Sequence, residues 1–264
     1  MRARRPPSLP KPLARAPGFR NDHDVMRNLY EWTSPSVGQT MHVARWGDAG
    51  KAFVLFPTGG ADYLDVERFR LVRALAPLVE AGRVRVYSVD SVCRQGWLAE
   101  IPPAEKVRWQ SRYAHFLEDE LLPFLDHDAG GHAGAVGVGG ASLGAYQAWT
   151  FASRRPDRVG LCVGLSGTYL MDRRLDGYWD QDWYYHDPRQ FVPGIEGPLL
   201  DQLRGVRFVF GVGERYENHS YTNAAEAVLH QKGIPVEVLR WREPAGHDWP
   251  TWRSMLPRIL DACA

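Results

Sequence analysis

The stretch Gly137–Trp149, "GVGGASLGAYQAW", sets one serine among four glycines, directly after an apolar run and directly before a helix-like segment. At its centre, Gly140–Gly144 forms a G-x-S-x-G motif around Ser142. In this motif the serine occupies a tight turn from strand to helix, and small neighbours let the turn pack while the hydroxyl projects into solvent. The helix N-terminus behind the serine favours developing negative charge. The context therefore predicts a nucleophile elbow.

Other glycine-rich motifs fit the same stretch poorly. A dinucleotide site requires G-x-G-x-x-G, but the sixth position counted from Gly137 is Ser142. A phosphate-binding P-loop requires a lysine after its last glycine, but Ala145 follows Gly144. These departures argue against a nucleotide-binding protein, and a purely structural glycine turn stays open as an alternative.

Outward from this motif, short apolar runs alternate with segments of helical periodicity. The predicted strands are a hairpin over 28–46 and then 51–57, 83–90, 134–140, 159–166, 206–211 and 235–241. The predicted helices cover 104–125, 143–153, 221–231 and 249–263. Such alternation is typical of an α/β fold whose mostly parallel central sheet has helices on both faces, and here the hairpin adds an antiparallel edge.

The chain length indicates one domain, and the nearly neutral net charge argues against a strongly charged binding partner. The chain has 264 residues and a net charge of +1, so no nucleic-acid or membrane partner is expected. Residues 1–22 are rich in arginine and proline and lack the apolar core of a secretory signal, which predicts a flexible basic arm before a single domain over 23–264. Cys93, Cys162 and Cys263 match neither a disulfide framework nor a metal site, so a reducing cytoplasm and no cofactor are expected.

A serine nucleophile needs a base and an acid, which in an α/β-hydrolase follow in the order serine, acid, histidine. His247, in "EPAGHDWPTW", lies between the last strand and the last helix and is the predicted base. Glu214 and Glu217, in "GVGERYEN", follow the strand where the acid belongs, and the residues alone do not separate them. Asp248 adjoins His247 and is badly placed to reach its Nδ1.

The developing oxyanion also needs donors. The main-chain N–H after the nucleophile, that of Leu143, is one expected donor. Gly59 and Gly60, in "LFPTGGADY" after an early strand, are placed to supply a second, because glycine lets the backbone turn its amides into the site.

Together these motifs resemble the putative-esterase branch of the α/β-hydrolases, which includes esterase D-like and mycolyltransferase-like proteins. The likeness is closest to a bacterial subgroup of small esterase family proteins, and it runs from about residue 28 to the end through "YEWTSPSVGQTM", "VLFPTGGADYLDVERF", "VYSVDSVCRQGW", "GASLGAY" and "KGIPVEVLRW…GHDWPTW". The resemblance implies Ser142 as nucleophile and His247 as base. It favours Glu217, followed by Asn218, as the acid, with Glu214 as the alternate.

A long aromatic and acidic segment interrupts the alternation. We expect residues 167–205 to form a cap-like insertion over the strand ends, where ligands bind in this topology. Its aromatic side chains either line a substrate pocket or pack the insertion onto the sheet, and those proposed for the pocket are Trp183, Tyr184 and Tyr185, with Tyr178 and Trp179 nearby. The acidic residues show no regular ligand spacing, so a solvated face is predicted rather than a metal site, for Asp172, Asp176, Asp180, Asp182 and Asp187.

The sequence thus predicts a cofactor-free serine hydrolase that cleaves small-molecule carboxylic esters through an acyl-enzyme. An acyltransferase with the same triad and a non-catalytic binding protein of the same fold are the alternatives. A homo-oligomer is left open.

Overall fold

The computed structural model describes residues 26–263. Its centre is one eight-stranded sheet in the order β1-β2-β4-β3-β5-β6-β7-β8. The strands are β1 (Arg27–Thr33), β2 (Thr40–Trp46), β3 (Lys51–Phe56), β4 (Val84–Val89), β5 (Val136–Ala141), β6 (Val159–Leu165), β7 (Arg207–Gly213) and β8 (Val236–Trp241). The β1–β2 and β2–β4 pairings are antiparallel and all others are parallel. The predicted fold class is confirmed. The predicted arm over residues 1–22 lies outside the described residues.

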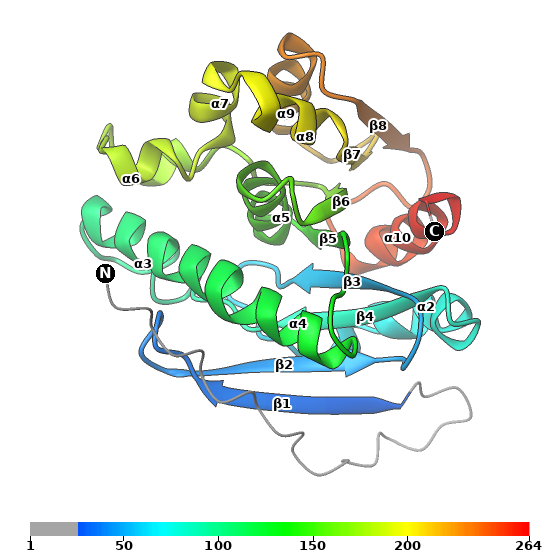
Figure 1. Ribbon diagram of the computed structural model, residues 1–264. Coiled ribbons are helices and arrows are strands. Elements are labelled where there is room, and N and C mark those ends of the chain that lie inside the picture. The colour runs from blue at the N-terminus through cyan, green and yellow to red at the C-terminus, as the bar shows by residue number, and fades with distance from the viewer. Residues whose placement is uncertain (1–25, 264) are drawn as a thin grey trace.

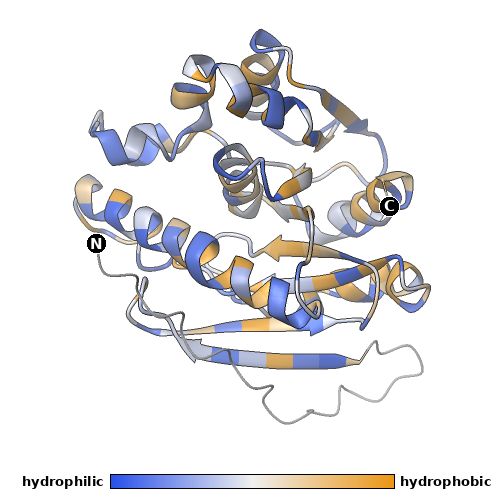
Figure 2. Ribbon diagram, viewed as in Figure 1, coloured by the Kyte–Doolittle hydropathy of each residue, from blue (hydrophilic) through white to orange (hydrophobic). Residues whose placement is uncertain are grey.

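Helices cover both faces of this sheet (Figure 1). On one face lie α3 (Pro103–Phe116), the π-helical turn η1 (Leu117–Leu121), α4 (Leu122–Asp128), α5 (Leu143–Arg154) and α9 (His219–Gln231). On the other face lie α2 (Leu71–Glu80) and α10 (Trp249–Cys263). Because β3, β5 and β7 are buried on both sides, they read as continuous apolar runs, and β3 is hydrophobic along most of its length in Figure 2. No helix within residues 26–263 is long and apolar enough to cross a membrane.

The helical connections differ from the prediction in three places. Helix α2, together with the short α1 (Asp65–Arg68), occupies a stretch to which the sequence assigned no element. The helix expected over 104–125 runs from 103 to 128 and contains the π-helical turn. The insertion between β6 and β7 is built from short helices, namely η2 (Met171–Arg174), α6 (Gln181–Tyr184), α7 (Pro188–Phe191), η3 (Val192–Gly194) and α8 (Gly197–Arg204).

A buried carboxylate fastens the end of α4 to the sheet. Asp128, with a side chain 9% exposed, accepts hydrogen bonds from Tyr30, Tyr87 and Arg45. Burial alone would raise the pKa of Asp128, but the hydrogen bonds from Tyr87 and Arg45 outweigh burial and hold it below its usual value. This cluster ties β1, β2 and β4 to the end of α4.

Candidate active site

Ser142 stands at the turn from β5 into α5, at the C-terminal edge of the parallel strands. Its backbone has φ 55° and ψ −118°, a conformation that costs a non-glycine residue about 1–3 kcal/mol. Main-chain hydrogen bonds hold it there: the Ser142 N–H donates to Leu165 at 2.9 Å, and its carbonyl accepts the N–H of Thr168 at 3.0 Å. The Ser142 Oγ lies 3.4 Å from the Thr168 Oγ1. The turn has the strand–serine–helix form that the motif predicts.

The two glycines of the motif have no room for a side chain. A Cβ at Gly140 would overlap the backbone of Gly144, and a Cβ at Gly144 would overlap the carbonyl of Phe56 at the end of β3. The first turn of α5 therefore lies directly against the adjoining strand ends. This close approach explains why the sequence needs small residues on both sides of the serine.

His247 and Glu217 come together on the other side of β6. The His247 Nδ1 lies 3.8 Å from the Glu217 Oε2, and the ring of His247 meets Trp252 edge-on at 5.3 Å. The imidazole is 44% exposed, whereas the Glu217 side chain is 3% exposed. An accessible imidazole backed by a buried carboxylate is the arrangement that a general base requires.

The buried carboxylate of Glu217 is held through its second oxygen. Glu217 Oε1 accepts the Ser166 hydroxyl at 2.7 Å and the Gly213 N–H at 2.9 Å. The Ser166 Oγ in turn accepts the indole N–H of Trp252 at 2.9 Å. Ser166 follows directly after β6, and Trp252 lies on α10, so one hydroxyl links the acid loop to the helix after His247. Nothing in the sequence indicates this role, because Ser166 is there only the last residue of an apolar run.

The alternative acids point elsewhere. Glu214 is 43% exposed and pairs with Arg242 at 3.5 Å. Asp248 accepts the N–H of Thr251 at 2.9 Å at the start of α10, and the hydrogen bonds from Thr251 lower the pKa of Asp248. Of the three carboxylates considered, the structure therefore brings Glu217 to His247.

The expected oxyanion donors lie next to one another. A Cβ at Gly59 would be 3.9 Å from the Cβ of Leu143, so the β3–α1 loop touches the start of α5. The main-chain N–H groups of Leu143, Gly59 and Gly60 have no hydrogen-bond acceptor within residues 26–263. Gly60 has φ +72°, which favours glycine. Three unused donors beside a nucleophile elbow can receive a developing negative charge.

Two further side chains, neither indicated by the sequence, border this loop. Arg94 Nε donates to the Gly60 carbonyl at 2.5 Å. Leu98 is 41% exposed and lies against both Gly59 and Gly60, 3.5 Å from where a Cβ at Gly60 would stand. Both belong to the segment after β4, so this segment forms one wall beside the expected oxyanion donors.

The aromatic residues proposed for the pocket lie in different surroundings. Trp183 is 2% exposed and packs edge-on against Trp97 at 5.7 Å. Tyr184 and Tyr185 line a cavity of about 450 Å³ together with Ser153 and Arg154, at the end of α5 away from Ser142. Trp183 thus packs the insertion onto the segment after β4, and Tyr184 and Tyr185 border the end of α5, an arrangement that fits the packing alternative.

The acidic residues of the insertion have structural contacts. Asp180 and Asp187 accept main-chain N–H groups at the starts of α6 and α7, and Asp172 pairs with Arg189 at 3.0 Å. Within residues 26–263, no group of three or more histidine, cysteine, aspartate or glutamate side chains could hold a metal ion.

Comparison with protein-family models matches residues 35–263 to the family described as "Putative esterase". A search of curated protein sequences found no match. Among solved structures, a ferulic acid esterase aligns with 14% identity and a TM-score of 0.68, over 90% of this chain and 97% of that one. An S-formylglutathione hydrolase from Agrobacterium tumefaciens aligns with 14% identity and a TM-score of 0.68, over 95% and 97%. FphF, a fluorophosphonate-binding serine hydrolase from Staphylococcus aureus, aligns with 15% identity and a TM-score of 0.67, over 90% and 98%.

Proposed function

Because the chain belongs to the putative-esterase family of the α/β-hydrolase fold, we propose that it cleaves carboxylic esters through an acyl-enzyme, using Ser142, His247 and Glu217. The Ser142 Oγ attacks the ester carbonyl while the His247 Nε2 takes its proton. The tetrahedral intermediate collapses, and the alcohol leaves with that proton. Water, deprotonated by His247, then attacks the acyl-enzyme and releases the acid and Ser142.

The observation that carries this proposal is the strained backbone of Ser142 at the start of α5. The strain costs stability and does nothing for packing, since the side chain is small. The strained conformation places the Ser142 hydroxyl at the C-terminal edge of the sheet, where ligands bind in α/β folds. Strain of this kind is typical of a catalytic serine.

The surroundings of Ser142 support the other roles. Glu217 is buried and fixed by two hydrogen bonds, so its charge is available to stabilise the imidazolium that forms at His247. The free N–H groups of Leu143, Gly59 and Gly60 support an oxyanion site made of backbone amides. The separation of 3.8 Å between His247 and Glu217 is long for a hydrogen bond, as is common in catalytic groups without substrate.

The test is covalent labelling of the intact protein with a fluorophosphonate, followed by peptide mapping. We expect a single adduct on Ser142 in the wild type and none in Ser142→Ala. p-Nitrophenyl esters of increasing acyl length then measure kcat and KM. Folded wild-type protein that takes no label would overturn the proposal and favour the non-catalytic binding protein.

The acyltransferase alternative uses the same first half-reaction, so labelling does not separate the two. Product analysis in the presence of a competing alcohol or amine does. We expect the free acid as the main product, because the proposal makes water the acceptor. A small-molecule ester substrate and a cytoplasmic location remain predictions from the sequence.

A further inference from the structure

The loop Thr58–Leu64, between β3 and α1, carries the glycines of the proposed oxyanion site and is compact in itself. The Ala61 N–H donates to the Thr58 carbonyl at 3.2 Å, and the Thr58 hydroxyl donates to the buried Asp65 at 3.1 Å. These bonds fix the shape of the loop. The glycine end of the loop is held by Arg94, Leu98 and Leu143, as described above, and the Tyr63 end has its own support.

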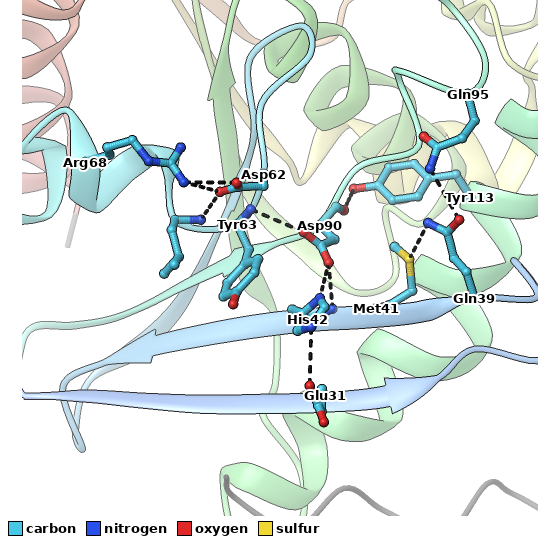
Figure 3. A network of polar contacts seen from close by, with 11 residues as sticks. Glu31, Gln39, Met41, His42, Asp62, Tyr63, Arg68, Asp90, Gln95 and Tyr113 are labelled. Atoms are coloured by element: carbon cyan, nitrogen blue, oxygen red, sulfur yellow. Dashed lines mark hydrogen bonds and ion pairs between the residues drawn. The ribbon is translucent and has the colours of Figure 1, made fainter. Parts of the chain in front are cut away.

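The outer end of this loop rests on a histidine–carboxylate pair from two neighbouring strands (Figure 3). The Tyr63 ring stacks on the His42 ring with centroids 4.8 Å apart and planes 8° from parallel. The Tyr63 main-chain N–H points to Asp90 Oδ1 at 3.4 Å. Tyr63 is three residues from Gly60 and belongs to the same compact loop.

The pair itself is held firmly. Asp90, directly after β4, accepts the His42 main-chain N–H at 2.9 Å and lies 2.6 Å from the His42 Nδ1, both through Oδ2. The main-chain carbonyl of Asp90 accepts the Tyr113 hydroxyl at 2.8 Å. The other nitrogen of His42, Nε2, lies 3.3 Å from Glu31 on the edge strand β1. Both ring nitrogens of His42 therefore face carboxylates, and neither is available as a base for Ser142.

We propose that His42 and Asp90 are positioning residues that hold Tyr63, and through it the amides of Gly59 and Gly60, in the orientation that the oxyanion requires. The inference rests on the proposed function. It assigns a role to a polar network in which Asp90 follows β4, two strands from β5, and His42 lies on β2, three strands from β5.

The direction of the pKa shift of Asp90 is consistent with a positioning role and not with a stabilising one. Burial raises the pKa of Asp90 above its usual value, and the contacts with His42 do not fully offset it. The charged form is therefore disfavoured in the folded protein, and a carboxylate here costs stability at neutral pH.

The test compares Tyr63→Ala and Asp90→Asn with two matched controls. Tyr63→Phe keeps the ring on His42, and Glu31→Gln changes the outer end of the same network. For Tyr63→Ala and Asp90→Asn we expect kcat to fall about tenfold and KM to stay within about twofold of wild type. Removing an oxyanion donor outright lowers kcat by about 10²–10³. The loss is smaller here because these variants only loosen the donors. The affinity for a boronic acid, a mimic of the tetrahedral intermediate, should fall by the same factor. The controls should stay within about twofold of wild type in both readouts.

Thermal unfolding and circular dichroism of each variant separate a structural effect from a positioning effect. The proposal is overturned if Tyr63→Ala and Asp90→Asn, folded at the assay temperature, keep wild-type kcat and boronic acid affinity. It is overturned for Asp90 alone if only Tyr63→Ala shows the loss. If wild-type Ser142 takes no fluorophosphonate, the proposed function fails and this inference fails with it. If Ser142 is labelled at the wild-type rate in every variant, only the inference fails.

Discussion

Two histidine–carboxylate pairs flank the strand that leads into Ser142, one on each side of it in the sheet. His42 and Asp90 lie on the β2–β4 side at 2.6 Å, and His247 and Glu217 lie on the β7–β8 side at 3.8 Å. The shorter pair has both imidazole nitrogens engaged with carboxylates. The longer pair has the more exposed imidazole and the more deeply buried carboxylate.

The difference shows that a short contact does not identify a catalytic pair. A base must have one nitrogen available to the nucleophile, and that nitrogen must be reachable from the strand ends where substrate binds. The His42–Asp90 pair fails the first condition, because both imidazole nitrogens face carboxylates, but it is well suited to holding a loop. The His247–Glu217 pair is suited to moving a proton, and it is expected to tighten when substrate is present.

The largest effect is expected from breaking the longer pair. Glu217→Gln should lower kcat by about 10³–10⁴, because the imidazolium at His247 loses its buried counter-charge. Glu214→Gln, a matched change three residues earlier, should stay within about twofold of wild type. Ester hydrolysis under saturating substrate measures both. Equal losses in the two variants would contradict the assignment of Glu217.

A smaller loss is expected from weakening the support of Glu217. Ser166→Ala removes one of the two hydrogen bonds to the carboxylate and should lower kcat about tenfold, since such a bond to a charged group is worth about 1.5–3 kcal/mol and only part of that is expressed in the transition state. Ser88→Ala is the control, because the buried hydroxyl of Ser88 has no partner within residues 26–263. An unchanged kcat in Ser166→Ala would show that the Gly213 N–H suffices to hold Glu217.

The pH dependence of the free energy of unfolding should distinguish Asp90, which we propose positions a loop, from Asp128, which stabilises the fold. The pKa of Asp90 is raised in the folded state, so the folded protein holds this proton more tightly, and the Asp90 contribution to stability is lost as pH rises through that pKa. The pKa of Asp128 is lowered, so its contribution is lost as pH falls below the usual aspartate value of about 3.9. Urea unfolding at a series of pH values measures the free energy of unfolding of each variant. As pH rises, the wild type should lose stability relative to Asp90→Asn. As pH falls, the wild type should lose stability relative to Asp128→Asn. The same sign for both would contradict this contrast.

The smallest effect is expected from the aromatic insertion. Tyr185→Ala should leave kcat and KM for short p-nitrophenyl esters within about twofold of wild type, because Tyr185 borders a cavity at the far end of α5. A large rise in KM would show instead that Tyr185 lines the substrate pocket, the role that the sequence predicts.

These contrasts also show which parts of the site the sequence could predict. The elbow was predictable because its requirements are local: two glycines, a serine, a preceding strand and a following helix. His247 was predictable from its place between the last strand and the last helix. Both features depend on chain order and on short-range sterics, which a sequence displays directly.

The remaining features depend on how the backbone turns after the strands end. Glu214 and Glu217 follow the same strand, and Tyr216, between them, has φ +62°, so one carboxylate turns inward and the other toward solvent. The pairing of His42 with Asp90 arises from the register of two strands that are far apart in sequence. The sequence also leaves two roles open for the aromatic insertion, because apolar rings suit a substrate pocket and a packed interface equally well.

The backbone of Ser142 has a consequence for how this chain evolves. Its φ of 55° is unfavourable for serine and readily adopted by glycine, and glycine here would add no clash. Substitution by glycine is therefore expected to make the folded protein more stable while removing the hydroxyl. In a lineage that no longer needed the reaction, selection for foldability alone would favour that replacement.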